Sequence, residues 1–350
     1  MGASSSFAAP KALDSPYTAA SGLLGCEPGE IAVVESATRA WQAAFGAVPL
    51  EAGDRVLTST AEYASNYLQM LHAARRRGVS IEVVPDDEAG QVSVDALAAT
   101  IDERVKLVAI THVPMGRGVV NPAAAVGRIT RAAGVPLLLD ACQSLGHVPI
   151  DVDAIGCDFL SATSRKFVRG PRGVGLLYAR AATTAALEPA LIDLRSASWT
   201  SRDGYALQPG GRRFESFEIS TAAKIGFGVA LGYALEWGLD AIWDRLRTLG
   251  DRLRHGLAAL PGVEVHDPDS ARGAIVTFSV VGWRPTDVRD ALRHAGVNVS
   301  VVDAATAHLD FDQRGLTAVV RASVHYYNDD DDLDRCCQAV AALRPGGLSG

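Results

Sequence analysis

Reactive and polar side chains stand at the ends of four short apolar runs of this sequence. They comprise hydroxyls, an aromatic ring, a carboxylate, an amide, an arginine and a lysine: Ser36, Thr38, Tyr63, Asp140, Gln143, Arg165 and Lys166. If the runs are strands of one open α/β sheet, their carboxyl ends meet at the edge where such sheets bind ligands. We therefore expect these groups to surround one site.

This set of groups matches what pyridoxal phosphate (PLP) requires. The aldehyde needs a lysine amine, and the pyridine nitrogen needs a carboxylate that keeps it protonated and the ring a strong electron sink. Lys166 is the only one of four lysines that follows such a run. Ser36 and Thr38 open a helix whose free N–H groups suit a phosphate, and an aromatic ring such as that of Tyr63 can lie against a flat cofactor.

Each residue taken alone also has a structural interpretation. Ser36 and Thr38 are typical helix caps, and Asp140 could cap the next helix. Tyr63 fits a half-buried surface position, and Lys166 fits a solvated one. His112, after another run, is interpreted as a structural histidine, and no spacing of His, Cys and Asp indicates a metal site. The coincidence of all the groups at one sheet edge favours PLP.

The elements that must position these residues follow from the hydrophobic pattern. Seven apolar runs alternate with helical stretches, and they cover residues 31–34, 55–59, 80–84, 107–111, 135–140, 159–163 and 174–179. This alternation predicts an α/β fold, a mostly parallel seven-stranded sheet with helices on both faces. The runs are apolar throughout, as expected of strands buried on both sides.

The remaining segments predict an arm and a second, smaller domain. Residues 1–30 are assigned to an N-terminal arm, irregular or flexible as far as residue 22. We place the large domain at 31–240, with a loop-rich stretch at 183–215 and a long helical stretch from 221 interrupted near Gly238. Residues 241–350 read as strands and helices of a small C-terminal α+β domain.

Composition excludes several classes of protein. The chain has 350 residues, of which 48% are hydrophobic, enough to form a large core. A net charge of −7 argues against a nucleic-acid surface. Five cysteines without framework spacing, no membrane-length apolar run and no signal-peptide pattern predict a soluble, cytoplasmic protein that does not bind membranes.

At these positions the chain resembles the class V aminotransferase-like enzymes of PLP fold type I. This family includes cysteine desulfurases, isopenicillin N epimerase-like proteins and the C–S lyases of ergothioneine biosynthesis. The segments that carry the resemblance are ESATRAW (35–41), EYASN (62–66), NPAAAVGRI (121–129), DACQSLGHVPIDV (140–152), CDFLSATSRKFVRGPRGVGLLY (157–178), RRFESFE (212–218) and VVRASVHYYN (319–328).

The resemblance implies a role for each matching residue. Lys166 would form the imine with PLP, Asp140 would pair with the pyridinium, and Gln143 would bond the ring hydroxyl. Tyr63 takes the stacking position that is histidine in the desulfurases. The matching phosphate contacts are Ala37, Thr38, Thr163 and Arg165. The segment 212–218 matches a loop that reaches the neighbouring subunit's site, which implies a homodimer with active sites at the interface.

Arg321 stands inside an otherwise apolar strand, 316–324. A buried guanidinium is costly unless it is paired, and its planar fork suits a carboxylate. The resemblance implies that Arg321 binds the α-carboxylate of an amino-acid substrate. The alternative is an arginine at a strand edge that faces water.

Two departures from the family bear on the reaction. Cysteine desulfurases carry a nucleophilic cysteine shortly before this arginine, but residues 297–320 contain none, which argues against persulfide chemistry of that kind. Met115 stands where desulfurases have an asparagine. Segments 212–218 and 319–328 look most like the ergothioneine-type C–S lyases.

We therefore expect a PLP-dependent lyase. It would remove the α-proton of an S-substituted cysteine or its sulfoxide and cleave the C–S bond by β-elimination. An amino-acid epimerase or an aminotransferase is the alternative, and a catalytically idle PLP-fold scaffold is an alternative of another class.

Overall fold

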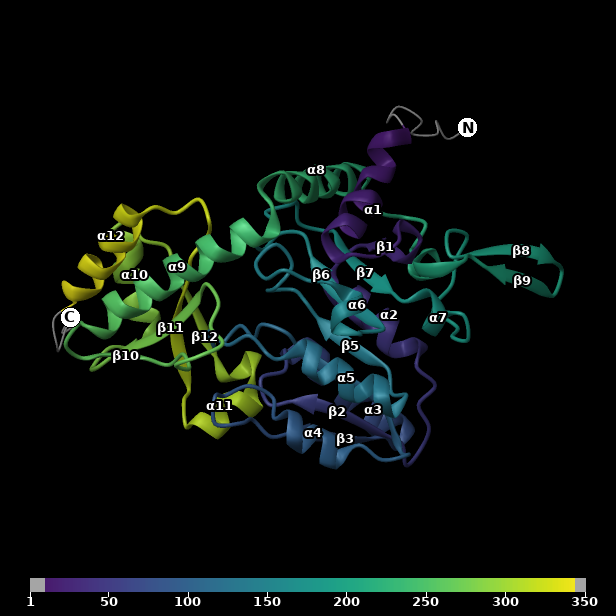
Figure 1. The fold of residues 1–350 in the computed structure, drawn as a ribbon, viewed down its shortest axis with the longest axis horizontal. Helices are drawn as coiled ribbons and strands as arrows, with labels where there is room; N and C mark the ends of the chain where they lie inside the picture. Colours follow the sequence, from purple (N-terminus) through teal and green to yellow (C-terminus); the bar gives the residue numbers. More distant parts are fainter. Residues whose placement is uncertain (1–9, 344–350) are drawn as a thin grey trace.

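The computed structural model describes residues 10–343, and its centre is a seven-stranded sheet (Figure 1). The strands are β1 (Ile31–Val34), β2 (Arg55–Ser59), β3 (Ser80–Val84), β4 (Val105–Thr111), β5 (Leu137–Asp140), β6 (Phe159–Thr163) and β7 (Gly175–Ala179), in the order β1-β7-β6-β5-β4-β2-β3. Neighbours from β3 to β6 are parallel, whereas β7 is antiparallel to both β6 and β1. Because no helical crossover joins β6 to β7, the chain returns in the opposite direction.

Helices cover both faces of this sheet, as the apolar pattern predicts. They are α2 (Ala37–Ala47), α3 (Ala64–Arg77), α4 (Val94–Thr100), α5 (Ala123–Ala133), α6 (Val152–Ile155), α7 (Ala181–Thr184) and α8 (Thr221–Trp237). Alternate strand residues enter different apolar clusters: Leu138 packs in the cluster of Trp41 from α2, while Leu137 and Leu139 pack in that of Val126 from α5. The predicted mostly parallel, doubly covered sheet is confirmed.

The prediction of an irregular N-terminal segment was wrong for residues 10–22. They belong to helix α1 (Pro10–Leu24), which lies along α8. Its Tyr17 is 2% exposed, donates a hydrogen bond to Glu215 (2.5 Å) and accepts one from Lys224 (2.5 Å). The Ser/Ala/Pro-rich composition hid this helix, because its burial depends on partners about 200 residues away in sequence. Residues 1–9 of the predicted arm lie outside the described part of the chain.

The chain leaves the large sheet through a bent pair of helices, α8 and α9 (Leu239–Ala258). They meet at 80° around Gly238, whose φ of 81° suits glycine. This is the predicted interruption. Between residues 10 and 343, no single helix has the length and apolar composition to cross a membrane; only this bent pair, taken together, meets both criteria.

A smaller antiparallel sheet follows, with the order β10-β11-β13-β12. Its strands are β10 (Val263–Val265), β11 (Ile275–Val280), β12 (Ser300–Asp303) and β13 (Ala318–Ser323), and its helices are α10 (Pro285–His294), α11 (His308–Arg314) and α12 (Asp330–Ala341). The predicted small α+β part is confirmed. The proposed domain boundaries at 30 and 240 remain our interpretation.

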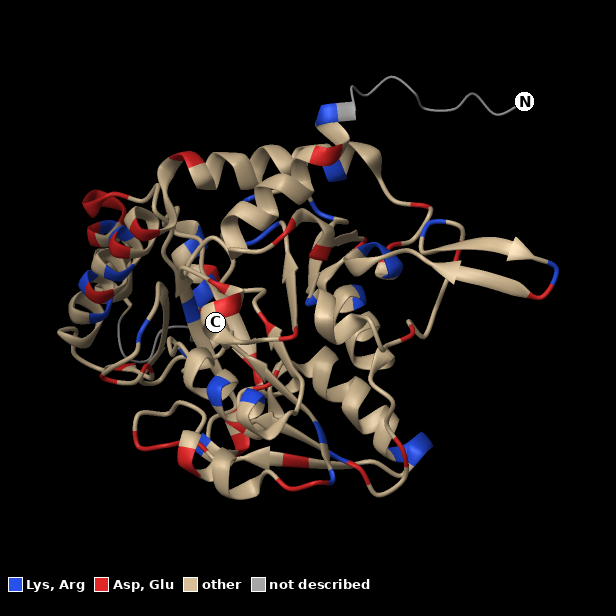
Figure 2. Ribbon diagram, turned by 45° about the vertical axis from the view of Figure 1, so that its right-hand side comes forward, with Lys and Arg blue, Asp and Glu red and all other residues tan. Residues whose placement is uncertain are grey.

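The predicted loop-rich stretch contains a β-hairpin, β8 (Ala197–Ser201) and β9 (Gly204–Leu207). It projects from the body of the molecule, and the figures show it apart from both sheets (Figures 1 and 2). Figure 2 also shows acidic and basic residues mixed over the ribbon. The described part of the chain also contains three 3₁₀ helices, Pro28–Glu30, Gly210–Phe214 and Ala304–Thr306.

Buried ion pairs join the two sheets. Arg117, after β4, pairs with Asp86 at 2.7 Å and also with Asp310 of α11. Asp267 accepts from Arg254 of α9 at 2.7 Å and from the backbone N–H of Gly118 at 3.1 Å. These contacts fix where the small sheet lies relative to the strand ends of the large one.

Candidate active site

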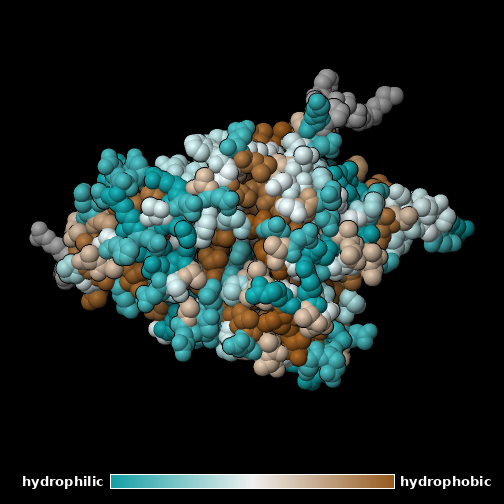
Figure 3. Space-filling model, in the orientation of Figure 1, coloured by the Kyte–Doolittle hydropathy of each residue, from teal (hydrophilic) through white to brown (hydrophobic). Residues whose placement is uncertain are grey.

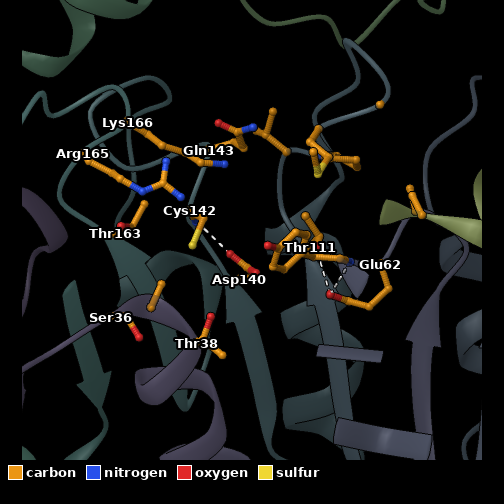
Figure 4. Close-up of a pocket in the computed structure, with 18 of the residues that line it drawn as sticks. Ser36, Thr38, Glu62, Thr111, Asp140, Cys142, Gln143, Thr163, Arg165 and Lys166 are labelled. Carbon is orange, nitrogen blue, oxygen red and sulfur yellow. Dashed lines mark hydrogen bonds between the residues drawn. The ribbon is translucent and has the colours of Figure 1, made fainter. Parts of the chain in front are cut away.

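A cavity lies beyond the carboxyl ends of the parallel strands (Figure 4). All nine residues predicted for cofactor binding or catalysis in the large sheet line it: Ser36, Ala37, Thr38, Tyr63, Asp140, Gln143, Thr163, Arg165 and Lys166. Glu62, Val113, Pro114, Met115 and Cys142 complete much of the wall, and Ala307 and Asp310 enter it from the small α+β part. These residues therefore lie together at the strand ends, as expected from the sequence, while their individual roles remain predictions.

The first turn of α2 forms one side of the cavity. Ser36 caps this helix by accepting a hydrogen bond from the N–H of Arg39 (3.2 Å). Gly175 of β7 lies directly beneath: a Cβ there would be 2.8 Å from the nitrogen of Ala37 and 2.6 Å from the carbonyl oxygen of Ala162. This close approach places the free N–H groups of α2 opposite Thr163 and Arg165 (Figure 4), a suitable cradle for a phosphate.

Asp140, at the end of β5, is 3% exposed and has only neutral donors as protein partners within residues 10–343. One carboxylate oxygen accepts from the backbone N–H of Cys142 (2.8 Å) and the other from the Asn66 amide (2.7 Å). These two bonds fix its orientation without neutralising it. A cationic ring nitrogen placed at this carboxylate would supply the missing counter-charge.

Lys166 lies in a buried environment with two arginines near it. Burial lowers the pKa of its amine, Arg321 and Arg165 lower it further, and Cys142 and Asp140 oppose them. A lower pKa increases the share of neutral amine, which is the form that reacts with an aldehyde and accepts a proton.

Arg321 does not line the cavity itself, but it lies close behind. Its strand β13 is an interior strand, between β11 and β12, so the strand-edge alternative does not hold. The guanidinium donates to Ser300 (3.3 Å), while its Nε is buried without a partner in the described chain. Burial, and then repulsion from Arg165, lower the pKa of Arg321. An anion between these arginines would relieve both effects.

Unpaired polar atoms provide a test of whether PLP fits. The amide Nε2 of Gln143 is buried at the cavity with no acceptor among residues 10–343, as expected of a donor to a ring hydroxyl. Together with the Lys166 amine, the Asp140 carboxylate and the α2 cradle, it matches the functional groups of PLP one by one. Tyr63, 37% exposed at the mouth, lines the cavity as its aromatic residue.

His112 is buried as the structural interpretation expects. It is 4% exposed, and burial lowers the pKa of its imidazole to about 4, so the ring is neutral at physiological pH. Its backbone N–H bonds the carbonyl of Asp140 at 2.9 Å.

Sequence analysis missed a second buried carboxyl group, Glu62. It is 3% exposed, and Asn66 bridges it to Asp140 with bonds of 2.8 and 2.7 Å. Burial, and then the charge of Asp140, raise the pKa of Glu62 to about 7. Glu62 and Asn66 both stand in segment 62–66, where Glu62 precedes the N-cap of α3 and Asn66 lies in its first turn, but their link to Asp140 depends on a contact 74 residues away in sequence.

Comparisons with known proteins agree with this site. Residues 14–336 match the family model for class-V aminotransferases. A probable cysteine desulfurase of Methanothermobacter thermautotrophicus is 32% identical over 318 residues, which span 89% of this chain and 78% of that protein. The chain therefore belongs to the class-V aminotransferase family, and it is a PLP-dependent enzyme.

Solved structures share the fold. The apo cysteine desulfurase of Thermococcus onnurineus NA1 superposes with a TM-score of 0.88 at 26% identity, covering 94% of this chain and 83% of that one. The cystine C–S lyase C-DES, solved with its reaction product cysteine persulfide, has a TM-score of 0.85, covering 96% and 87%. At 20% identity, this second likeness concerns the fold alone.

The close packing under α2 gives a first prediction. Gly175→Ala inserts a methyl group against Ala37 and displaces the N–H cradle, so we expect PLP affinity to fall by about tenfold or more, a loss of about 1.4 kcal/mol. Absorbance titration of the apoenzyme with PLP measures it. Gly232→Ala is the matched control, since the methyl group added there meets open space, with no neighbouring atom within 4 Å. A folded Gly175→Ala protein with unchanged affinity would contradict the cradle.

The raised pKa of Glu62 gives a second prediction. Folding favours the neutral form of this carboxyl, so ionisation of Glu62 destabilises the folded protein. The destabilisation is absent below pH 4.5, where the carboxyl is neutral in both the folded and the unfolded chain, and it grows as the pH rises to about 7. Glu62→Gln removes this penalty. Relative to wild type, we expect the apoenzyme's free energy of unfolding to gain on the order of 3 kcal/mol across that window.

Urea unfolding at several pH values measures this difference, and Glu88→Gln, at an exposed glutamate, is the control. A difference between Glu62→Gln and wild type that stays constant with pH would show that Glu62 does not titrate in this range.

Proposed function

We propose that this cysteine desulfurase-like PLP enzyme is a lyase that acts on S-substituted cysteines or their sulfoxides. The balanced reaction converts the substrate and water to a thiol (a sulfenic acid from a sulfoxide), pyruvate and ammonium. The observation that carries the proposal is the combination of a complete PLP-type cavity with the absence of any cysteine from residues 297–320. When bound, PLP supplies the electron sink that stabilises negative charge at Cα.

Arg321 is proposed to bind and orient the substrate carboxylate. Its buried, unpartnered Nε and the lowered pKa of its guanidinium both indicate a cation that lacks an anion. A bidentate carboxylate would satisfy its fork and would hold the Cα–H bond in a fixed direction. This accounts for an arginine on β13 so close to Lys166.

Lys166 is proposed as the base that removes the α-proton, with Asp140 holding the proton on the ring nitrogen. A base must be neutral before it accepts a proton, and burial together with Arg321 and Arg165 favours the neutral amine. Asp140 is suited to hold a proton on a ring nitrogen because its bonds to Asn66 and to the Cys142 backbone fix the carboxylate without neutralising it.

The cavity wall supports a substituted sulfur rather than transfer of sulfur to the protein. Cys142 is the cysteine that lines the cavity, but burial and Asp140 raise the pKa of its thiol well above the usual value, which keeps it protonated and a poor nucleophile. Val113, Pro114, Met115 and Ala307 offer apolar surface to a substituent on sulfur. Elimination leaves that substituent on the departing thiol.

We also propose a homodimer whose interface includes segment 212–218. Phe217 is 67% exposed, and Leu191, Leu194 and Trp199 nearby in the chain are also exposed, an unusual number of apolar side chains for a free surface. Figure 3 shows hydrophobic surface gathered in patches, with the hairpin tip hydrophilic.

A cytoplasmic location remains a prediction. All five cysteines are free thiols, as a reducing compartment favours.

The reaction itself is the third prediction. We expect the PLP-loaded enzyme to convert S-alkylcysteines or their sulfoxides to pyruvate and ammonium in equal amounts, and Lys166→Ala to form neither. Solvent deuterium entering Cα without pyruvate would indicate an epimerase. A keto acid that retains sulfur would indicate an aminotransferase, and a protein that binds no PLP a scaffold. Each of these results contradicts the lyase.

The fourth prediction separates the roles of Arg321 and Asp140. Arg321→Ala removes the carboxylate site, so we expect KM to rise by about tenfold or more with PLP affinity nearly unchanged. The KM of Arg321→Lys should lie between those of wild type and Arg321→Ala. Asp140→Asn weakens the electron sink, so we expect kcat to fall by about 100-fold and PLP affinity far less. Steady-state kinetics with parallel PLP titrations measure both. An unchanged KM, or equal losses of turnover and cofactor affinity in Asp140→Asn, would contradict the assignments.

A further inference from the structure

Glu62 is a buried carboxyl group for which the proposed mechanism has no task. Its Oε1 accepts hydrogen bonds from the backbone N–H of Tyr63 (2.9 Å), the amide of Asn66 (2.8 Å) and the hydroxyl of Thr111 (2.7 Å). Its Oε2 accepts one hydrogen bond, from the hydroxyl of Thr58 at 3.3 Å. Three good donors thus converge on one oxygen, and a single long contact serves the other.

This arrangement accommodates both protonation states of Glu62. The Thr58 hydroxyl can donate to Oε2 when the carboxyl is ionised and accept from it when a proton sits there, while the three bonds to Oε1 stay in place. The groups that face Glu62 come from β2 (Thr58), α3 (Asn66), β4 (Thr111) and β5 (Asp140), and Asp140 is the charged one among them. Its charge, together with burial, raises the pKa of Glu62 to about 7.

Asn66 connects Glu62 directly to the proposed cofactor carboxylate. Its Nδ2 carries two hydrogens and donates to Glu62 at 2.8 Å and to Asp140 at 2.7 Å. The amide is 2% exposed, so little water screens the two carboxyl groups from one another. A change of charge on Glu62 is therefore felt at Asp140.

We propose that Glu62 is a positioning residue for the cofactor: acting through Asn66, its charge sets how firmly Asp140 keeps the proton on the pyridine nitrogen. The inference rests on the proposed role of Asp140 and adds a regulator to it. Ionised Glu62 places a second negative charge behind Asp140 and favours the protonated ring. When Glu62 takes up a proton, Asp140 acts alone.

A pH titration of the enzyme loaded with ring-labelled PLP, followed by the NMR chemical shift of the ring nitrogen, tests this. Glu62→Gln keeps the shape and the acceptor oxygen and can place its amide toward Thr58, so it removes the charge alone. Above neutral pH we expect the variant to show more of the unprotonated ring nitrogen than wild type, equivalent to a shift of the ring-nitrogen transition to lower pH by between a few tenths and about one unit. PLP stoichiometry should be unchanged.

An identical titration in both proteins overturns the proposal, because a merely structural glutamate would not move it. Thr111→Val provides a second measurement: it removes one donor from Glu62 and keeps the carboxyl, so we expect a smaller shift in the same direction. No shift, or a shift to higher pH, overturns the proposal.

Asp140→Asn separates this inference from the function on which it rests. If Asp140→Asn alters the spectrum and Glu62→Gln does not, the link through Asn66 is wrong and the role of Asp140 stands. If neither variant alters it, the role of Asp140 is wrong, and the proposal for Glu62 fails with it.

Discussion

A carboxylate held inside the protein without a cationic partner is the constraint on which this site depends. Asp140 ends the strand that lies fourth in the seven-stranded order, and its described partners are a backbone N–H and the Asn66 amide. Removing a charge from water costs several kcal/mol unless a counter-charge or strong hydrogen bonds compensate it. An arginine at this position would have satisfied Asp140 permanently. Neutral donors instead orient it and leave its charge available to a cationic ring.

The opposite charges stand at the other side of the cavity. Arg165 and Lys166 follow β6, Arg321 approaches from β13, and the positive end of α2 lies opposite Thr163. Burial, together with repulsion among these cations, lowers the pKa values of Lys166 and Arg321. A ligand with a cationic ring, an anionic phosphate and a bound substrate carboxylate balances both the Asp140 charge and the cluster of cations. It does so in only one orientation, with the ring nitrogen toward Asp140 and the anions toward the cations. The separation of charge therefore selects the ligand and its direction together.

Strand ends could be predicted from the sequence because they depend on local pattern. Continuous apolar runs mark strands buried on both faces, and parallel strands bring their carboxyl ends to one edge, so nine residues from separate segments reached one cavity. Contacts that depend on long-range packing could not be predicted. Tyr17 and Glu215 are 198 residues apart, and Asn66 and Asp140 are 74 apart. The helix α1 and the contact of Asn66 with Asp140 were missed for this reason.

The position of Arg321 depends on contacts of the same kind. Its sheet shares no strand with the large sheet, so its approach to Lys166 is set by the buried pairs of Arg117 and Asp267 and by His147. The Nδ1 of His147 lies 3.0 Å from the carbonyl of Gln143, and its Nε2 accepts from the N–H of Ala274 at 2.9 Å. One nitrogen donates and the other accepts, so the ring must be neutral, and burial lowers its pKa to about 3.

His147 therefore ties the cofactor segment that contains Gln143 to the segment that begins β11, with no charge to disturb the cavity between them. Ion pairs would have done the same mechanical work, but a permanent charge beside Gln143 would compete with Asp140 and Arg321 for the ligand. The structure places its ion pairs on Arg117 and Asp267, with Asp310 already paired to Arg117 where it lines the cavity, and uses a neutral imidazole next to the cofactor segment. This division keeps the electrostatic asymmetry of the cavity intact while fixing the distance across which the substrate must fit.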